Sequence, residues 1–129
     1  MKKIGQSAED YLETIFHLEQ EYGKVRSIDV AKKHGVSRPS INKAVQNLKK
    51  LSYVDQESYG DIRLTALGRS KALEIIKRHT LLQFFLTDIL KVSPATATDD
   101  ACKIEHYLSD ETMHKLESFL TEYQQGKKD

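Results

Sequence analysis

The chain has 129 residues, of which 39% are hydrophobic and 30% charged, and its formal net charge at neutral pH is +1. This composition is typical of one or two small globular domains, and it excludes the weakly hydrophobic, highly charged class of disordered chains. No apolar run approaches the roughly 18 residues of a membrane-spanning helix, and the start of the chain shows no signal-peptide pattern. The single cysteine, Cys102, cannot form an internal disulfide, so we expect a cytoplasmic protein without a membrane partner.

Charge is distributed unevenly along the chain. Residues 24–50 carry eight lysines or arginines against one acid, Asp29, which gives this window a net charge of +7. Residues 92–129 carry eight acids and four lysines, a net charge of −4. A basic block beside an acidic remainder indicates a polyanion-binding face and a second part with another task, whereas the ordinary alternative is a solvated helix face.

Helical periodicity predicts two helices at the start of the chain. Apolar side chains recur at helical spacing over 7–22, and Gly23 follows as a stop signal. A short second helix is expected over 28–34, capped at its start by Ser27 and closed by Gly35.

A third helix is predicted over 38–51. Ser37 is placed to cap it, and Pro39 lies in its first turn, where a missing N–H is harmless. Its polar residues lie mostly off the apolar stripe, which consists of Ile41, Val45 and Leu48.

The period then changes to two. Residues 53–57 and 61–65 alternate in polarity around the turn signal Ser58-Tyr59-Gly60, which predicts a β-hairpin. Helical periodicity returns over 66 to about 90.

Ser93-Pro94 then breaks the chain before two more helices, predicted over about 95–108 and 110–124. The polar tail 124–129 is expected to fray.

The order of these elements predicts a mainly α fold that begins with a winged helix-turn-helix. A short helix, a Gly-Val-Ser turn, a polar-faced helix and a hairpin follow one another directly over residues 27–65. A plain three-helix core also produces such spacing, but here the basic window coincides with the motif. We therefore predict that this part binds double-stranded DNA.

The third helix of such a motif lies in the major groove. Arg38 can pair with guanine, and Asn42 and Gln46 can pair with adenine. Nearby basic side chains suit contacts to DNA phosphates. The hairpin residues Tyr59 and Arg63 can touch the flanking DNA backbone. The DNA-binding candidates are Lys24, Arg26, Lys32, Lys33, Ser37, Arg38, Pro39, Ser40, Asn42, Lys43, Gln46, Tyr59 and Arg63.

Metal-ligand residue types occur on three predicted helices. Cys102, Glu105 and His106 stand at i, i+3 and i+4, which would place all three on one face of one helix. Asp10 and Glu13 form a second pair of this kind, and His79 lies on the long helix. Each also has an ordinary explanation: a buried cysteine, acids in a first helical turn, or a hydrogen-bonded core histidine.

Five segments resemble the diphtheria-toxin-repressor/manganese-transport-regulator family of metal-dependent transcriptional repressors, and the resemblance covers residues 6 to about 120. The Arg-His pair combined with a downstream Glu-His-x-x-Ser is the most specific feature. The segments are Ser7-Ala8-Glu9-Asp10-Tyr11-Leu12-Glu13-Thr14-Ile15, Val36-Ser37-Arg38-Pro39-Ser40-Ile41, Leu64-Thr65-Ala66-Leu67-Gly68, Arg78-His79-Thr80-Leu81-Leu82 and Ala101-Cys102-Lys103-Ile104-Glu105-His106-Tyr107-Leu108-Ser109.

The resemblance implies a homodimer that binds a DNA operator when it holds metal. It implies a winged helix-turn-helix domain over 1–70 and a helical dimerisation and metal-binding domain over 71–129, without the SH3-like third domain of the longer members. It also implies one ligand set, which consists of Asp10, Glu13, His79, Cys102, Glu105 and His106.

The two branches of the family differ at these positions, and this chain mixes them. Asp10 and Glu13 resemble the manganese-type members, whereas Cys102 resembles the iron-type members; manganese-type members have a glutamate in its place. The iron-type ancillary site needs an acid and a histidine where this chain has Gln83 and Thr98, so we expect that site to be missing or altered.

Ligand softness bears on the choice of metal. A thiolate and two imidazoles favour Fe(II), Co(II) or Zn(II), whereas carboxylates suit Mn(II). We expect Fe(II) or Mn(II) as the activating ion, with Zn(II) or Co(II) binding in vitro; the number of ions per chain stays open.

Three other functions compete with metal-gated repression. The first is a winged-helix regulator that is metal-independent or redox-responsive through Cys102. The second is an enzyme that uses Cys102 and His106 as nucleophile and base; no third orienting group is apparent, so we expect no enzyme and no small-molecule substrate. The third is a metal store, which would leave the basic window unexplained.

Overall fold

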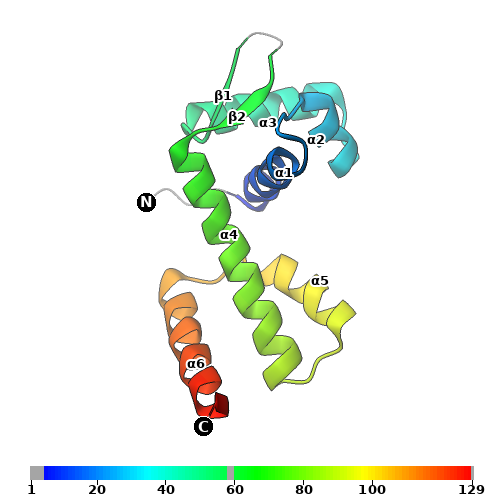
Figure 1. The fold of residues 1–129 in the computed structure, drawn as a ribbon. Coiled ribbons are helices and arrows are strands. Elements are labelled where there is room, and N and C mark those ends of the chain that lie inside the picture. The colour runs from blue at the N-terminus through cyan, green and yellow to red at the C-terminus, as the bar shows by residue number, and fades with distance from the viewer. Residues whose placement is uncertain (1–4, 58–59, 129) are drawn as a thin grey trace. The chain divides into compact units, whose positions relative to one another are not determined.

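The computed structural model describes residues 5–57 and 60–128, and the chain divides into two units, Met1–Glu74 and Ile75–Asp129. Helices dominate both units, which confirms the predicted mainly α fold class (Figure 1). None of the described helices is both long and apolar enough to cross a membrane.

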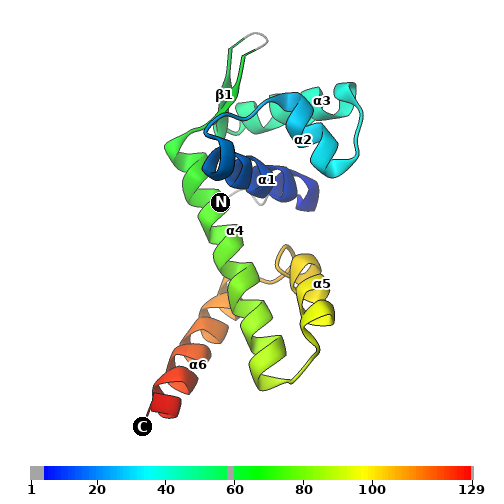
Figure 2. The ribbon, with the colours of Figure 1, turned by 45° about the vertical axis from the view of Figure 1, so that its right-hand side comes forward.

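The first unit begins with three helices, α1 (Gln6–Tyr22), α2 (Ser27–His34) and α3 (Arg38–Lys50), which Figure 2 shows packed together. Gly23 and Gly35 end the first two with φ angles of 76° and 63°, in the left-handed region that favours glycine. Both predicted stops are confirmed.

Caps and ends show where the prediction held and where it was wrong. Ser37 caps α3 as predicted, since its Oγ accepts a hydrogen bond from Ser40 N at 3.3 Å. Ser27 does not cap α2. It is the first residue of that helix, and its Oγ accepts a hydrogen bond from Gln56 Nε2 of the hairpin at 3.2 Å. Helix α3 ends at Lys50, one residue earlier than predicted.

The core of the first unit is built from the apolar stripes of these helices and from the hairpin. Fully burying a large aliphatic side chain stabilises a fold by about 1.5–3 kcal/mol, so this cluster is its main source of stability. The three residues predicted as the inner stripe of α3 are all buried. The buried apolar residues from the first helix to the hairpin are Leu12, Ile15, Leu18, Val25, Val30, Ala31, Ile41, Val45, Leu48, Val54 and Ile62.

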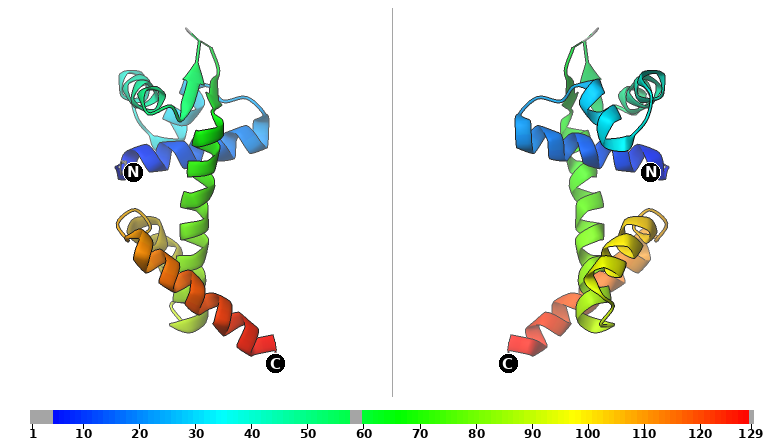
Figure 3. Two further views of the ribbon diagram at one scale, coloured as in Figure 1. Left: turned by 90° about the vertical axis from the view of Figure 1, so that its left-hand side faces the viewer. Right: turned by 90° about the vertical axis from the view of Figure 1, so that its right-hand side faces the viewer.

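The hairpin consists of β1 (Val54–Gln56) and β2 (Ile62–Leu64), which are antiparallel and shorter than predicted (Figure 3). A single bridge joins Val25 to Ile62 and ties the hairpin to the segment between α1 and α2. Lys49 Nζ of α3 donates a hydrogen bond to Gln56 O at 2.9 Å, so the hairpin is also fastened to α3.

Helix α4 (Ala66–Phe84) continues into a five-residue π-helix, η1 (Phe85–Ile89). The helical run therefore has the predicted length, but its last turn is wider than an α-helix. Gly68 near its start is buried against the chain before the hairpin: a Cβ there would lie 1.9 Å from Tyr53 O. Only glycine permits this close approach of backbone to backbone.

The second unit combines the end of α4 with α5 (Pro94–Ile104) and α6 (Asp110–Lys128). Its core joins Leu82, Ala101 and Met113, one from each helix. Two predicted boundaries were wrong. Helix α5 ends at Ile104 rather than near 108, and α6 continues to Lys128 rather than ending near 124.

Candidate functional site

The turn between α5 and α6 carries Glu105 and His106, which are only 2% and 4% exposed. The prediction that the helix of Cys102 continues to His106 was wrong, because α5 ends at Ile104. Glu105 is the C-cap in right-handed helical geometry, and its N–H donates to Ala101 O at 3.1 Å. Ser109 Oγ accepts a hydrogen bond from Thr112 N at 3.1 Å and so caps α6.

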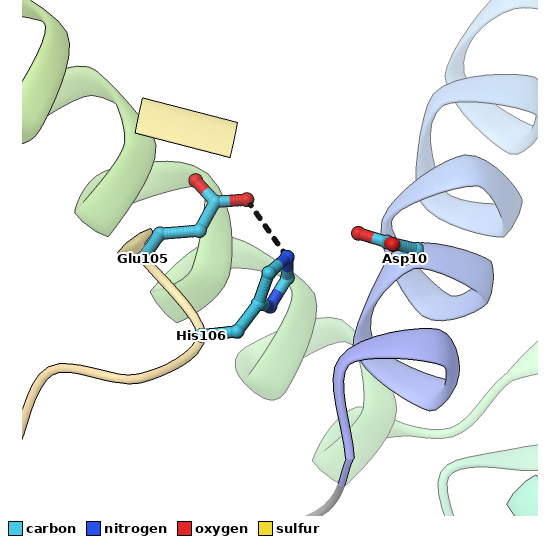
Figure 4. A group of neighbouring side chains, drawn as sticks. All are labelled: Asp10, Glu105 and His106. Carbon is cyan, nitrogen blue, oxygen red and sulfur yellow. Dashed lines mark ion pairs between the residues drawn. The ribbon is translucent and has the colours of Figure 1, made fainter. Parts of the chain in front are cut away.

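His79 of α4 nevertheless meets these residues. Its Nδ1 lies 3.1 Å from Glu105 Oε2, and Cys102 Sγ lies 3.7 Å from the same nitrogen. The other carboxylate oxygen, Glu105 Oε1, lies 3.4 Å from His106 Nε2 (Figure 4). Glu105 is therefore the centre of the cluster, with one imidazole near each of its oxygens.

The donor chemistry of this cluster fits a divalent transition-metal ion. One thiol, one carboxylate and two imidazoles are the ligand types that iron, cobalt and zinc accept in proteins. A carboxylate that is 2% exposed is costly to bury unless positive charge or hydrogen-bond donors face it, and here imidazoles do. Cys102 is exposed and so leaves the cluster open to solvent on its side.

The remaining two candidate ligands belong to the first unit. Asp10 and Glu13 lie one turn apart on α1, as the spacing predicts, and both are partly buried. Glu13 pairs with His17 at 3.7 Å. Four of the six candidate ligands are thus gathered within the second unit, and the other two share one helix of the first. The altered ancillary pair forms a direct hydrogen bond, from Gln83 Nε2 to Thr98 Oγ1 at 3.0 Å.

The DNA-binding candidates lie on the surface of the first unit. Tyr59 falls outside the described residues. The other twelve are all exposed, and they are Lys24, Arg26, Lys32, Lys33, Ser37, Arg38, Pro39, Ser40, Asn42, Lys43, Gln46 and Arg63.

Two hollows divide the exposed face of α3. The first is lined by Arg38 and Asn42 together with residues of the hairpin and the start of α2. The second is lined by Ser40 and Lys43 together with the start of α1. Gln46 lines both. The three predicted base readers therefore share the hollow that faces the hairpin, while Lys43 lines the other.

Two of the predicted phosphate contacts have acidic partners. Arg26 donates two hydrogen bonds to the Asp29 carboxylate, at 3.0 and 3.2 Å, and this contact holds the pKa of Asp29 below its usual value. Arg63 lies 4.0 Å from Glu57, and both Glu57 and Asp61 line the hollow beside α3. The hairpin therefore offers DNA less positive charge than its arginine alone suggests.

One connection inside the first unit has no local sequence signal. His34, at the end of α2, bonds through Nε2 to Thr14 Oγ1 at 2.8 Å, and its ring lies 4.5 Å from that of Tyr11. Burial lowers the pKa of His34, and Asp10 opposes this shift. The contact joins the helix that carries two candidate ligands to the helix-turn-helix, and only the fold reveals it.

Two family models match the chain and together cover most of it. One is described as "Iron dependent repressor, N-terminal DNA binding domain" and matches residues 3–62. The other is described as "Iron dependent repressor, metal binding and dimerisation domain" and matches residues 65–127.

Relatives of known sequence or structure agree with these matches. An uncharacterized HTH-type transcriptional regulator of Methanocaldococcus jannaschii is 33% identical over 121 residues, which cover 93% of this chain and 97% of the relative. Transcriptional regulator MntR of Salmonella typhimurium is 37% identical over 117 residues, covering 91% of this chain and 72% of the relative. A solved manganese-dependent transcriptional repressor in complex with manganese aligns with a TM-score of 0.77 at 33% identity, over 88% of this chain and 52% of that chain.

Proposed function

Because the chain belongs to the iron-dependent repressor family of metal-responsive DNA-binding regulators, we propose that it represses transcription by binding an operator when Fe(II) or Mn(II) is bound. The observation that carries this proposal is the cluster of His79, Cys102, Glu105 and His106 in the domain that the family uses for metal. We assign the DNA-binding domain to residues 1–70 and the dimerisation and metal-binding domain to residues 71–129.

The first domain supplies the DNA contacts. Arg38, Asn42 and Gln46 are exposed on α3 and line one hollow, so they are the proposed readers of base edges in the major groove. Exposed lysines around them, such as Lys32 and Lys33, neutralise phosphates and make the affinity fall with salt. A homodimer presents two such helices, which suits an operator with two half-sites.

The second domain supplies the metal ligands. His79, Cys102, Glu105 and His106 would hold the ion, and the family resemblance adds Asp10 and Glu13 from α1. A bound divalent cation supplies positive charge to which thiolate, carboxylate and imidazole groups bind together. This proposed ligand set includes residues of both domains. A bound ion would therefore favour the arrangement of the two recognition helices that fits the two half-sites of the operator.

The same assignment has consequences for class and compartment. We propose that the protein is a regulator and not an enzyme, because Cys102 and His106 belong to the proposed ligand cluster around Glu105 and the family consists of repressors. We also propose that it acts in the cytoplasm, where its operator DNA is found.

The deciding experiment is anaerobic DNA binding measured by fluorescence anisotropy at fixed salt. The DNA would be an operator fragment selected from promoters of metal-uptake genes, and the arms would be chelator, Fe(II), Mn(II) and Zn(II). We expect tight binding only with metal. Equally tight binding in chelator would contradict the proposal and favour a metal-independent or Cys102-based redox regulator.

Variants of the ligand cluster test whether the metal response of DNA binding depends on it. Glu105→Gln and His106→Ala should lose the metal response and keep weak, salt-sensitive DNA binding. His114→Ala is the matched control, since this exposed histidine lies within α6. A full metal response in the Glu105 and His106 variants would show that the ligand assignment is wrong.

A further inference from the structure

Arg78 of α4 directs its guanidinium group at the connection between α5 and α6. Its Nη1 donates hydrogen bonds to Glu105 O at 3.0 Å and to Leu108 O at 2.9 Å. Its Nη2 donates to the carboxylate of Asp110, the first residue of α6. The side chain is 15% exposed, so this contact is largely sheltered from water. One planar group therefore contacts the beginning of the turn, its end and the helix that follows.

The connection that Arg78 contacts carries two proposed metal ligands. Glu105 is the C-cap of α5 and its N–H donates to Ala101 O at 3.1 Å, but no further turn of that helix follows it, because α5 ends at Ile104. Carbonyl groups at a helix end need partners from elsewhere. Arg78 supplies such a partner for the carbonyl of Glu105, the residue at the centre of the ligand cluster.

From this geometry we propose that Arg78 is a positioning residue for the metal site, an inference that rests on the proposed function. Arg78 contacts the backbone of the ligand turn and does not itself coordinate metal. Its neighbour His79 faces the Glu105 side chain while Arg78 holds the Glu105 carbonyl. Two consecutive residues of α4 thus contact the same glutamate, one at its backbone carbonyl and the other at its side-chain carboxylate.

The ion pair alone does not explain this arrangement. Asp110 is 68% exposed, and exposed ion pairs contribute little to stability because water screens them. The two hydrogen bonds to backbone carbonyls are the part that sets the path of the turn. Arginine makes these two contacts through Nη1 and the Asp110 contact through Nη2, two nitrogens held in one plane, whereas lysine has a single nitrogen.

The test is an anaerobic Co(II) titration of the full chain, followed by the absorption of the Co(II)–thiolate and Co(II) d–d bands. Arg78→Gln should weaken Co(II) binding by about 10–100-fold, the usual effect of losing a group that orients a metal ligand. Arg78→Lys keeps the positive charge but lacks the planar guanidinium group. Its Co(II) affinity should fall between those of the unmodified chain and Arg78→Gln. Circular dichroism of each variant reports whether it remains folded.

Two controls separate positioning from charge and from general packing. Lys77→Gln removes a cation from the neighbouring position of α4. The Nζ atom of Lys77 lies 2.8 Å from the Glu117 carboxylate on α6. Asp110→Asn removes the ionic partner but leaves both carbonyl acceptors in place. Both should bind Co(II) within about twofold of the unmodified chain, a change well below the loss expected for Arg78→Gln.

The outcomes are distinguishable. Unchanged Co(II) affinity and band positions in folded Arg78→Gln would overturn the role of Arg78 and leave the proposed function standing. If that variant does not fold, Arg78→Lys decides by the same comparison, and unchanged affinity in it overturns the inference. Failure of the unmodified chain to bind Co(II) would overturn the proposed metal site and this inference together.

Discussion

Nδ1 of His79 lies 3.1 Å from Oε2 of Glu105, although 26 positions separate the two residues in the chain. The contact joins α4 to the turn after α5, and Cys102 Sγ lies 3.7 Å from the same nitrogen. Metal ligands must be deprotonated to bind, so protons compete with a cation for such a cluster. The third group near this nitrogen is the thiol of Cys102, and its softness should affect which cation the cluster binds most tightly.

Exchanging this thiol should change the metal preference. Cys102→Glu replaces a soft sulfur ligand with a hard oxygen ligand, so Mn(II) should gain and Co(II) should lose affinity, each by about tenfold or more. Parallel Mn(II) and Co(II) titrations measure the ratio. Cys102→Ser serves as the control that removes sulfur without adding a carboxylate. An unchanged ratio in Cys102→Glu would show that Cys102 is not a ligand.

Two basic residues of the first unit should affect DNA binding in different ways. Arg38 lines the hollow beside the hairpin and is a proposed base reader, so Arg38→Ala should weaken operator binding by about 1–3 kcal/mol and leave random DNA much less affected. Lys33→Gln should weaken both and lower the salt slope by about one, because Lys33 is a proposed phosphate contact. Anisotropy titrations at several salt concentrations separate the two effects. Equal losses on both DNAs for Arg38→Ala would contradict base reading.

Gly68→Ala should be strongly destabilising. Its Cβ would lie 1.9 Å from Tyr53 O and 2.8 Å from Tyr53 C, and backbone atoms cannot move aside as a flexible side chain can. We expect a loss of about 3 kcal/mol or more in the free energy of unfolding. Gly126→Ala is the matched control, because apart from its chain neighbours and the backbone of its own helix no atom lies within 4 Å of its Cβ position on α6. It should be neutral or up to about 1 kcal/mol more stable. Urea unfolding of both variants decides the point.

Acid should weaken the first unit through His34. Burial lowers the pKa of this histidine in the folded chain, with Asp10 opposing, while the unfolded chain keeps the usual value near 6.5. Between the two values the unfolded chain binds more protons, so stability is complete above about pH 6.5 and falls as the pH drops through that value. Urea unfolding at about pH 7.5 and pH 5.5 should show a larger loss in the unmodified chain than in His34→Gln.

His17→Gln provides the comparison for this effect, because the side chain of His17 is 59% exposed. It should leave the pH dependence of stability close to that of the unmodified chain. Equal pH dependence in the unmodified chain and in His34→Gln would show that His34 does not carry the effect.

Much of the first unit could be predicted from sequence. The stops at Gly23 and Gly35, the cap at Ser37 and the buried stripe of α3 all follow from interactions between residues a few positions apart. Helical and strand periods, glycine's freedom at positive φ and the capping oxygen act over one or two turns, so they can be read without a structure.

The second unit was harder to predict, and the reason is local. Apolar spacing favours helix up to about residue 108, but α5 ends at Ile104, and Ser109 caps the helix that follows. The i, i+3 spacing does bring Cys102 and Glu105 to the same nitrogen of His79, whereas His106 lies in a buried turn and not on the predicted helix.

The sequence by itself determined the helix-turn-helix order, the basic window and the ligand residue types, because each depends on residues close together in the chain. Tertiary structure alone decided the contacts of His34 with Thr14, of Arg78 with the turn and of His79 with Glu105, which join residues 20 to 30 positions apart. Such pairs form because burial leaves polar groups that must find partners, and the packing of helices determines which partners are within reach.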